Sequence, residues 1–221
     1  MLVRQRREPV VVIGLGRFGS ALALDLSRRG TEVLAIDRSA KVVQQHSTEL
    51  TRVVAADCTD IDALRELGVD EFYIGVVAIG GDIESSILAT SLLVELGVES
   101  IWAKAITAHH GRILERVGAN HVVFPEREAG QRVAHLVSGQ MLDYVQVDDD
   151  FAIAEIRPPK ELVGVPLGHT GIRSKYGTTV VAVKPSGGQF SNAAADTELI
   201  HDDVILVTGR LKDLERFANL P

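Results

Sequence analysis

Three glycines near the start of the chain have the spacing that lets a peptide backbone hold a phosphate group. Gly14, Gly16 and Gly19 form a G-x-G-x-x-G pattern between the apolar run Val10–Ile13 and a helical run. In this pattern the first glycine permits a tight turn, the second lets the backbone approach a pyrophosphate, and the third allows close packing of helix and strand. Free N–H groups at the start of the helix then face the phosphates. The spacing therefore predicts nucleotide binding by a βαβ unit.

An acidic residue at the end of the next predicted strand completes the pattern. Asp37 lies about 20 residues after the glycine loop, where its carboxylate can accept hydrogen bonds from both hydroxyls of a ribose. The same carboxylate would repel a 2′-phosphate, so NADP is disfavoured as a ligand. Arg38 follows, and it could stack on adenine or be a solvated surface arginine. An adenine nucleotide without a 2′-phosphate is the predicted ligand.

The end of the third predicted strand is expected to line the adenine side of this pocket. Asp57 and Cys58 stand at that position, and Asp57 could accept a hydrogen bond from the exocyclic amine of adenine. Alternatively, Asp57 is a turn or cap residue before the helix predicted to begin at Asp60. We assign Asp57 and Cys58 to the binding site.

Two residues inside the glycine loop complete the predicted site. Arg17 occupies a variable position beside the phosphates, and Phe18 follows it. A fixed cation there supplies charge that a triphosphate, or a phosphate bound by a neighbouring subunit, could use. The alternative for Arg17 is an ordinary surface residue.

The chain lacks the residues that would make this nucleotide site an enzyme. None of the 7 histidines has an acidic partner at a useful spacing, and no G-x-S-x-G, H-E-x-x-H or Walker G-x-x-x-x-G-K-[ST] pattern occurs. The segment after the nucleotide-binding region is also too short for a substrate domain. A binding and sensing module is therefore favoured over an enzyme.

Composition narrows the class of protein further. With 46% hydrophobic and 24% charged residues among 221, the chain can bury a core. The net charge of −7 argues against nucleic-acid binding, which requires basic residues to displace counterions. Cys58 is the single cysteine of the chain, so a disulfide within the chain is excluded. No apolar run approaches about 18 residues, so we expect a cytoplasmic protein without direct membrane insertion.

Alternating strand and helix patterns must position the site. The predicted strands are Pro9–Ile13, Glu32–Ile36, Arg52–Ala56, Phe72–Ala78, Ser100–Lys104 and His121–Phe124. The predicted helices are Ser20–Arg29, Asp60–Leu67, Glu84–Leu96 and His110–Val117, and they stop at Gly30, Gly68, Gly97 and Gly118. This alternation predicts an α/β fold of Rossmann type, with a doubly wound parallel sheet.

The pattern changes after a last helix, predicted over Glu126–Leu142. The acidic run 148–150 reads as a linker or turn, and short strands and one terminal helix follow it. They are predicted at Phe151–Ile156, Thr178–Val183, Val204–Thr208 and Leu211–Asn219. We therefore expect a nucleotide-binding domain over residues 1–143 and a small α+β domain over residues 144–221. A domain that small usually oligomerises or docks on a partner.

Several motifs, the glycine loop among them, resemble one family. They are Gly14–Gly19, Val77–Gly80, Ile101–Ala105, His110 with Leu114, Gly118-Ala119 and Pro125-Glu126, then Arg173–Gly177 and Asp203–Gly209. In this order they resemble the RCK-domain regulatory subunits of bacterial Ktr and Trk potassium uptake systems, most nearly the KtrA type. The resemblance covers nearly the whole chain and implies a C-terminal RCK domain, also called TrkA-C-like, for dimerisation and regulation.

The resemblance also implies partners and ligands. It implies a homo-octameric ring, built of dimers, docked on a KtrB- or TrkH-like potassium translocator at the inner face of the membrane. ATP and ADP would compete for the site, with ATP favouring the active state. Arg17 would reach a γ-phosphate near a subunit boundary, Lys104 would lie near the phosphates, and Glu126 would hold a divalent or monovalent cation.

Cyclic di-AMP is a further ligand that the resemblance raises, at the C-terminal domain. Arg173 lies in the matching region, but residues 189–193 lack the proline that some relatives have there. Two alternatives to an ATP sensor stay open. The first is a TrkA-like subunit that senses NAD or NADH, and the second is a small NAD-dependent oxidoreductase. Arg17 and Glu126 favour the triphosphate.

Overall fold

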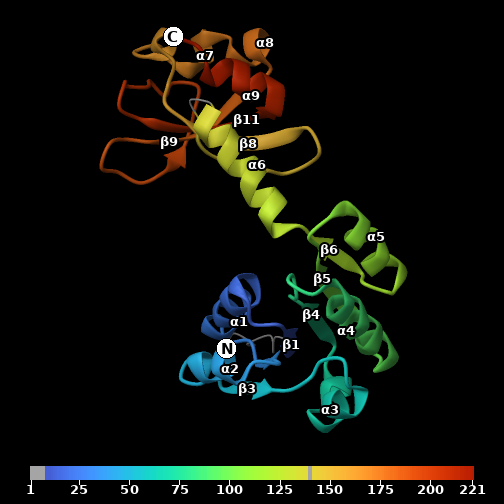
Figure 1. The fold of residues 1–221 in the computed structure, drawn as a ribbon. Helices are drawn as coiled ribbons and strands as arrows, with labels where there is room; N and C mark the ends of the chain where they lie inside the picture. The colour runs from blue at the N-terminus through green and yellow to red at the C-terminus, as the bar shows by residue number, and fades with distance from the viewer. Residues whose placement is uncertain (1–7, 139–140) are drawn as a thin grey trace. The chain divides into compact units, whose positions relative to one another are not determined.

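The Val- and Ile-rich runs of the first half form one parallel sheet in the computed structural model, which describes residues 8–138 and 141–221 (Figure 1). Its strands are β1 (Val10–Ile13), β2 (Val33–Asp37), β3 (Arg52–Ala55), β4 (Ile74–Val77), β5 (Ser100–Lys104) and β6 (His121–Val123). They are hydrogen-bonded in the order β3-β2-β1-β4-β5-β6. The order reverses beside β1, and ligands of open α/β sheets bind at that switch point. The predicted doubly wound parallel sheet is confirmed.

Helices cover both faces of this sheet. Figure 1 shows α1 (Arg17–Arg28) and α2 (Ala40–His46) on one side, and α4 (Ile83–Glu95) and α5 (Ala108–Arg116) on the other. A short helix, α3 (Ile61–Glu66), and a 3-10 turn at Val69–Glu71 lead into β4. The glycines predicted to end helices, Gly30, Gly68, Gly97 and Gly118, all have positive φ. The helix α2 was not predicted from the sequence, because it is short and buries none of its residues.

Burial on both faces explains why the strands read as continuous apolar runs. Val11 and Ile13 of β1 pack into one core cluster, and Val10 and Val12 pack into another on the opposite face. All four are at most 4% exposed. Each aliphatic side chain buried in this way stabilises the fold by about 1.5–3 kcal/mol. These two layers hold the strand ends, and therefore the loops of the site, in fixed positions.

The helix predicted over Glu126–Leu142 is shorter in the structure. It is α6 (Pro125–Ser138), and the strand β7 (Met141–Gln146) begins three residues later. The prediction was wrong at its C-terminal end because Met141 and Tyr144 are buried in the core of the second unit and pair with the next strand. An apolar run at a helix end does not distinguish a helix from the strand that follows it.

The chain divides into two compact units between Arg127 and Glu128, and the predicted boundary between residues 143 and 144 stays a prediction. The end of α6 and the start of β7 lie with the second unit for a physical reason. Leu136 packs against the core of that unit, and the Arg132 guanidinium contacts the Asp143 carboxylate at 2.6 Å.

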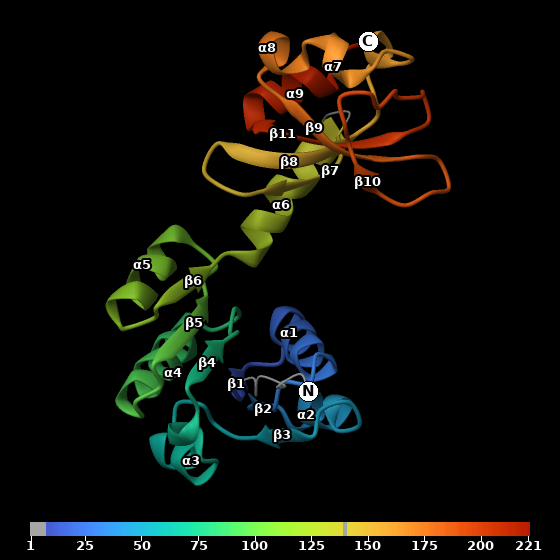
Figure 2. The same cartoon turned by 180° about the vertical axis from the view of Figure 1, so that it is seen from behind.

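The second unit is an antiparallel sheet with short helices. It contains β7, β8 (Phe151–Ile156), β9 (Thr179–Lys184), β10 (Ser191–Asn192) and β11 (Val204–Arg210), in the order β10-β9-β11-β8-β7. A 3-10 turn (Lys160–Leu162) precedes the helices α7 (Leu167–Thr170), α8 (Ile172–Tyr176) and α9 (Leu211–Ala218), and α8 and α9 lie side by side (Figure 2). The acidic run 148–150 forms the turn between β7 and β8, as one of its two interpretations predicted. The predicted α+β class is confirmed.

No helix within residues 8–138 and 141–221 combines the length and the apolar character needed to cross a bilayer.

Candidate nucleotide-binding site

The glycine loop has a backbone that only glycine accommodates easily. Gly14 has φ +94°, a left-handed conformation that a side chain would strain. A Cβ added to Gly19 would overlap the carbonyl oxygen of Gly14 and lie 2.9 Å from the Cβ of Ala78. A Cβ on Gly16 would meet no atom within 4 Å among the described residues. Gly14 and Gly19 are therefore needed for folding, whereas the space beside Gly16 is open to a ligand.

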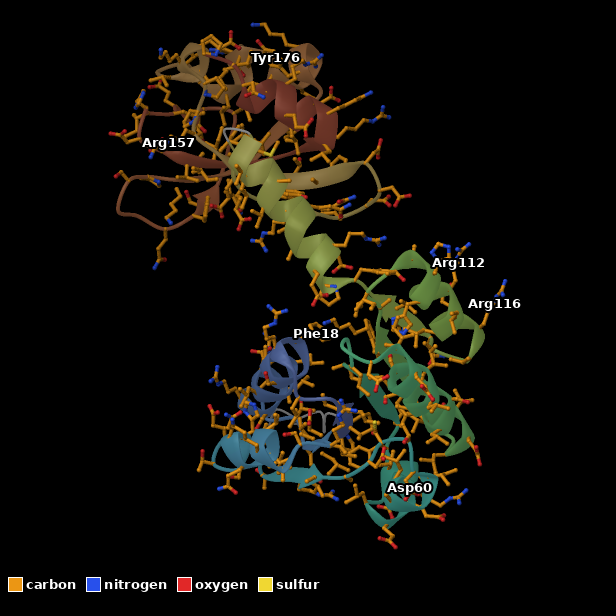
Figure 3. All side chains as sticks on the ribbon, in the orientation of Figure 1. Phe18, Asp60, Arg112, Arg116, Arg157 and Tyr176 are labelled. Atoms are coloured by element: carbon orange, nitrogen blue, oxygen red, sulfur yellow. The ribbon has the colours of Figure 1, made fainter. Side chains whose placement is uncertain are left out.

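The start of α1 differs from the other helix starts of the first unit. The helices α2, α3, α4 and α5 are capped by the side chains of Ser39, Asp60, Asp82 and Thr107. Figure 3 labels Asp60 at the beginning of α3. Within the described structure, the N-cap of α1 is Gly16, and no side chain accepts from its first N–H groups. These donors, and the positive end of the helix dipole, are left for an anion.

A pocket of about 320 Å³ lies at the carboxyl ends of the central strands. It is lined by Ile13, Gly14, Gly16, Ile36, Asp37, Arg38, Asp57, Cys58, Thr59, residues 78–82 and Ser85. Small-molecule sites in proteins usually measure about 300–1,000 Å³. Six of the predicted site residues line the pocket, and these are Gly14, Gly16, Asp37, Arg38, Asp57 and Cys58.

The remaining predicted residues lie outside the pocket lining. Phe18 and Gly19 are in the first turn of α1, which follows the loop, and Figure 3 labels Phe18 at this helix. Arg17, which begins α1, is exposed. Lys104 ends β5 and Glu126 is the second residue of α6, on the far side of β4 from the glycine loop.

The Asp37 carboxylate is held by the glycine loop and by the turn that follows β2. Its Oδ2 accepts a hydrogen bond from the backbone N–H of Leu15 at 2.7 Å, and its Oδ1 accepts one from the N–H of Ser39 at 2.8 Å. A carboxylate oxygen can accept more than one hydrogen bond, so both oxygens keep capacity for ribose hydroxyls. The bond to Leu15 also ties the end of β2 to the glycine loop. The carboxylate is therefore oriented before any ligand arrives.

The sequence left two roles open for Asp57, as a residue of the adenine pocket or as a turn or cap residue before α3. The structure gives the cap to Asp60 and leaves Asp57 in the turn and in the pocket wall. Oδ1 of Asp57 accepts hydrogen bonds from the Thr59 N–H at 2.9 Å and from the Thr59 hydroxyl at 2.7 Å. These two bonds hold the pKa of Asp57 below its usual value. Asp60, in contrast, caps α3 by accepting from the N–H groups of Asp62 and Ala63. Asp57 is thus both a turn residue and an ionised group in the pocket wall.

Cys58 contributes an apolar surface rather than a reactive thiolate. Its burial, assisted by the neighbouring Asp57 charge, raises its pKa to about 11. The thiol therefore stays protonated at neutral pH, and it packs against the main core of the first unit.

Asp82 is a pocket residue that was not predicted from the sequence. It caps α4 by accepting from the Ser85 N–H at 3.1 Å and from the Ser85 hydroxyl at 2.7 Å, which lowers its pKa. Its Oδ2 also lies 3.5 Å from the Arg38 guanidinium. The ends of β2 and β4 flank the glycine loop, so this ion pair spans it. An aspartate before a helical run is the only signal that could have found it.

Lys104 and Glu126 meet each other instead of standing apart. The Lys104 Nζ donates to Glu126 Oε1 at 2.7 Å, and Lys104 is only 8% exposed. This hydrogen bond is the main reason that the pKa of Glu126 is lowered, and the Arg17 charge contributes less. No cluster of three or more His, Cys, Asp or Glu side chains suited to a metal occurs among the described residues. A cation at Glu126 stays a prediction.

The second unit has a pocket of its own. It measures about 400 Å³ and is lined by Leu167, Gly168, Gly171, Ile172, Arg173, Thr178, Thr179, Val180 and residues 193–195. Arg173 is the charged member of this lining, and its Nε donates to the Thr179 hydroxyl at 3.2 Å.

Comparison with known proteins gives both units a family. Residues 10–125 match the model of the TrkA-N domain, and residues 151–221 match that of the TrkA-C domain. The chain is 38% identical to Ktr system potassium uptake protein C of Bacillus subtilis, over 96% of each chain. It is 34% identical to Ktr system potassium uptake protein A of the same organism, over 98% of each chain.

Solved structures share this fold. The RCK domain of GsuK superposes with a TM-score of 0.68 at 20% identity, covering 100% of this chain and 50% of that one. The GsuK channel bound to NAD superposes with a TM-score of 0.65 at 19% identity, covering 96% of this chain and 39% of that one. GsuK bound to ADP superposes with a TM-score of 0.52 at 27% identity, covering 61% of this chain and 35% of that one.

Proposed function

Because the chain belongs to the TrkA-N and TrkA-C family of Ktr and Trk potassium uptake proteins, we propose that it is an RCK regulatory subunit whose first unit binds an adenine nucleotide. The observation that carries this proposal is the glycine loop. The uncapped start of α1 faces a pocket whose rim holds the oriented Asp37 carboxylate. Phosphates would contact the free N–H groups, and ribose hydroxyls would contact Asp37.

The proposed consequence of binding is control of a membrane potassium translocator of the KtrB or TrkH type. The names of the two Bacillus relatives support potassium uptake as the process. The resemblance supports a homo-octameric ring, built of dimers, at the inner face of the membrane. A ligand shifts a conformational equilibrium only as far as its affinities for the two states differ. The ring would therefore need a ligand contact that exists in one state only.

We propose that ATP favours the active state over ADP through Arg17. Arg17 is exposed in the first turn of α1, and its positive charge contributes to the lowered pKa of Glu126. A γ-phosphate placed near both residues would gain from Arg17, and it would require a divalent or monovalent cation to offset the charge of Glu126. An ADP molecule would lack this contact. Binding at Arg17 would then discriminate between the two nucleotides.

NAD or NADH is the second candidate ligand, and the structure of one protein of the same fold contains NAD. The GsuK channel superposes on 96% of this chain in its NAD-bound structure. The pocket residues Asp37, Asp57 and Cys58 would contact only the adenosine part, which NAD shares with ATP. Ligand choice would therefore depend on the phosphate side of the site. A hydride-transfer assay with mixed small substrates tests the remaining alternative, an oxidoreductase.

The pocket of the second unit is the proposed site of cyclic di-AMP. Arg173 offers a guanidinium to a phosphate, and residues 193–195 offer a small apolar wall. The absence of a proline from residues 189–193 distinguishes this chain from some relatives and makes a direct test necessary.

A thermal-shift series on the full chain tests these proposals together. ATP, ADP, NAD, NADH and cyclic di-AMP are added separately, with and without Mg²⁺. A ligand that binds only the native state raises the apparent stability by about 2.7 kcal/mol at 100 times its Kd. We expect shifts with ATP and ADP, and a smaller ATP shift in Arg17→Ala with the ADP shift unchanged. A shift with NADH and none with ATP would replace the first ligand by the second.

Arg28→Ala is the matched control, because Arg28 is a cation in the last turn of the same helix. It should leave the difference between ATP and ADP unchanged. If Arg17→Ala also leaves that difference unchanged, Arg17 has no role at a γ-phosphate.

A further inference from the structure

Lys104 is a nearly buried cation that lies between the pocket and the helix α6. Its Nζ contacts Glu126 at 2.7 Å, and Glu126 is its only ion-pair partner among residues 8–138 and 141–221. The carboxylate is in the first turn of α6, and its side chain is 58% exposed. The ammonium is therefore the fixed member of the pair and the carboxylate is the movable one.

The same ammonium lies against the wall of the nucleotide pocket. A Cβ built on Gly80 would be 2.9 Å from the Lys104 Nζ, and Gly80 lines the pocket. The preceding residue, Ile79, contacts the space beside Gly14, so this wall adjoins the phosphate-binding loop. Gly80 has no left-handed backbone conformation to explain its identity. Its missing side chain instead makes room for the lysine.

The helix that Glu126 begins leads out of the nucleotide-binding unit. The division between the two units falls after Arg127, and α6 continues from there into the second unit. The Lys104–Glu126 pair thus fixes the first turn of the connecting helix to the end of β5. A change at this pair is a change at the start of the connection.

We propose that Lys104 is shared between Glu126 and the phosphates of the bound nucleotide, so that phosphate binding draws the ammonium away and releases the first turn of α6. This inference rests on the proposed nucleotide binding and adds a coupling route to it. An ammonium has three donors but one charge, so a phosphate competes with the carboxylate for it. The start of the connection to the second unit would then respond to the phosphates of the ligand and not to its adenosine.

Competition predicts opposite effects for the two members of the pair. The affinity for ADP is measured by calorimetry in EDTA, which removes any divalent cation at Glu126, and adenosine is the ligand without phosphate. Glu126→Gln should bind ADP about 3-fold more tightly, because the phosphate no longer competes with a partly exposed carboxylate. Lys104→Met should bind ADP about 10-fold more weakly. Neither variant should change the affinity for adenosine.

Amide hydrogen exchange tests whether phosphate binding releases the first turn of α6. The N–H groups of residues 129–132 bond back to the carbonyls of residues 125–128, so they report the first turn of α6. ADP should speed their exchange in the wild-type chain. Glu126→Gln should show fast exchange without ADP and no further increase with it. If the pair had only a structural role, Glu126→Gln and Lys104→Met would both show fast exchange, but Glu126→Gln would not bind ADP more tightly than the wild type.

Gly80→Ala tests the contact from the side of the pocket. Its new Cβ would fall 2.9 Å from the Lys104 Nζ, so it should displace the ammonium and weaken ADP binding. ADP affinity equal to that of the wild type would show that the position of this ammonium does not matter for the phosphates.

The outcomes separate this inference from the proposed function. If the wild-type chain binds neither ADP nor adenosine, the proposed function fails and this inference falls with it. If ADP binds, but Glu126→Gln binds it equally or more weakly, the coupling is overturned while nucleotide binding stands. Exchange at residues 129–132 that is unaffected by ADP would also overturn the coupling.

Discussion

The pockets of the two units differ in how their polar groups are held. In the first unit, Asp37 and Asp57 accept hydrogen bonds from N–H groups two residues further along the chain. In the second unit, Arg173 donates to the side chain of Thr179, and the facing wall comes from residues 193–195. The first pocket is assembled from turns at the ends of parallel strands, whereas the second depends on segments that meet only through tertiary packing. Local turn chemistry makes the first site readable from sequence.

The largest expected effect tests how rigid the first site is. Gly19→Val should destabilise the first unit by about 3 kcal/mol or more, because a side chain there overlaps backbone that cannot move. Urea denaturation, followed separately for each unit by hydrogen exchange, measures the loss. The second unit should be unaffected. Gly130→Ala, within α6, is the control and should be neutral or stabilising by up to about 1 kcal/mol, since its Cβ meets nothing described within 4 Å.

The second prediction concerns the pocket of the second unit. Arg173→Ala should weaken cyclic di-AMP binding about 10- to 100-fold, because a charge-assisted hydrogen bond contributes about 1.5–3 kcal/mol. Affinity for ADP should not change. Lys175→Ala, two residues along in α8 and outside the pocket lining, is the matched control. Equal cyclic di-AMP affinity in the wild type and Arg173→Ala would remove the proposed ligand from this pocket.

The third prediction concerns how the stability of the first unit depends on pH. His110 in the first unit is only 2% exposed, and its burial lowers its pKa below the usual 6.5. The unfolded chain therefore binds the proton more readily than the folded one, so stability falls as the pH drops below about 6.5. The urea midpoint of the first unit should decrease between about pH 7.5 and 5.5.

His110→Asn should flatten that pH dependence, because asparagine does not titrate. His109→Asn, at the exposed neighbouring position, should keep the dependence of the wild type. An unchanged pH slope in His110→Asn would show that another group is responsible.

The smallest effect concerns Cys58 as a probe of the first pocket. Because its pKa is raised to about 11, iodoacetamide should alkylate it at least about tenfold more slowly than a free cysteine at pH 8. ADP should slow the reaction further, since Cys58 lines the pocket. Mass spectrometry follows the modification. Alkylation at the same rate with saturating ADP would place the nucleotide away from Cys58.

Sequence alone predicted the elements with strong periodicity and the residues held by local turns. The parallel strands, the glycine-ended helices and six pocket residues, among them Asp37 and Asp57, were found in this way. It missed α2, α7 and α8, which are short and carry little apolar periodicity. It also ran α6 into β7, because only tertiary pairing makes Met141 a strand residue.

Long-range contacts account for what the sequence did not reveal in the site. Lys104 and Glu126 are 22 positions apart, and nothing in their local sequence indicates that they form a pair. Arg38 and Asp82 are 44 positions apart and meet only because β2 and β4 flank β1. Such pairs depend on sheet order, which a single sequence specifies only indirectly.

Calorimetric titration of the full chain with ATP and with ADP tests the central claim, that an adenine nucleotide binds at the glycine loop of the first unit. The comparison uses Asp37→Asn and, as a control, Asp62→Asn, an exposed carboxylate in the same unit whose side chain is 82% exposed. We expect saturable binding to the wild type and to Asp62→Asn. Asp37→Asn should bind at least about tenfold more weakly, because it loses charged hydrogen bonds to the ribose. Wild-type affinity in Asp37→Asn would contradict the account.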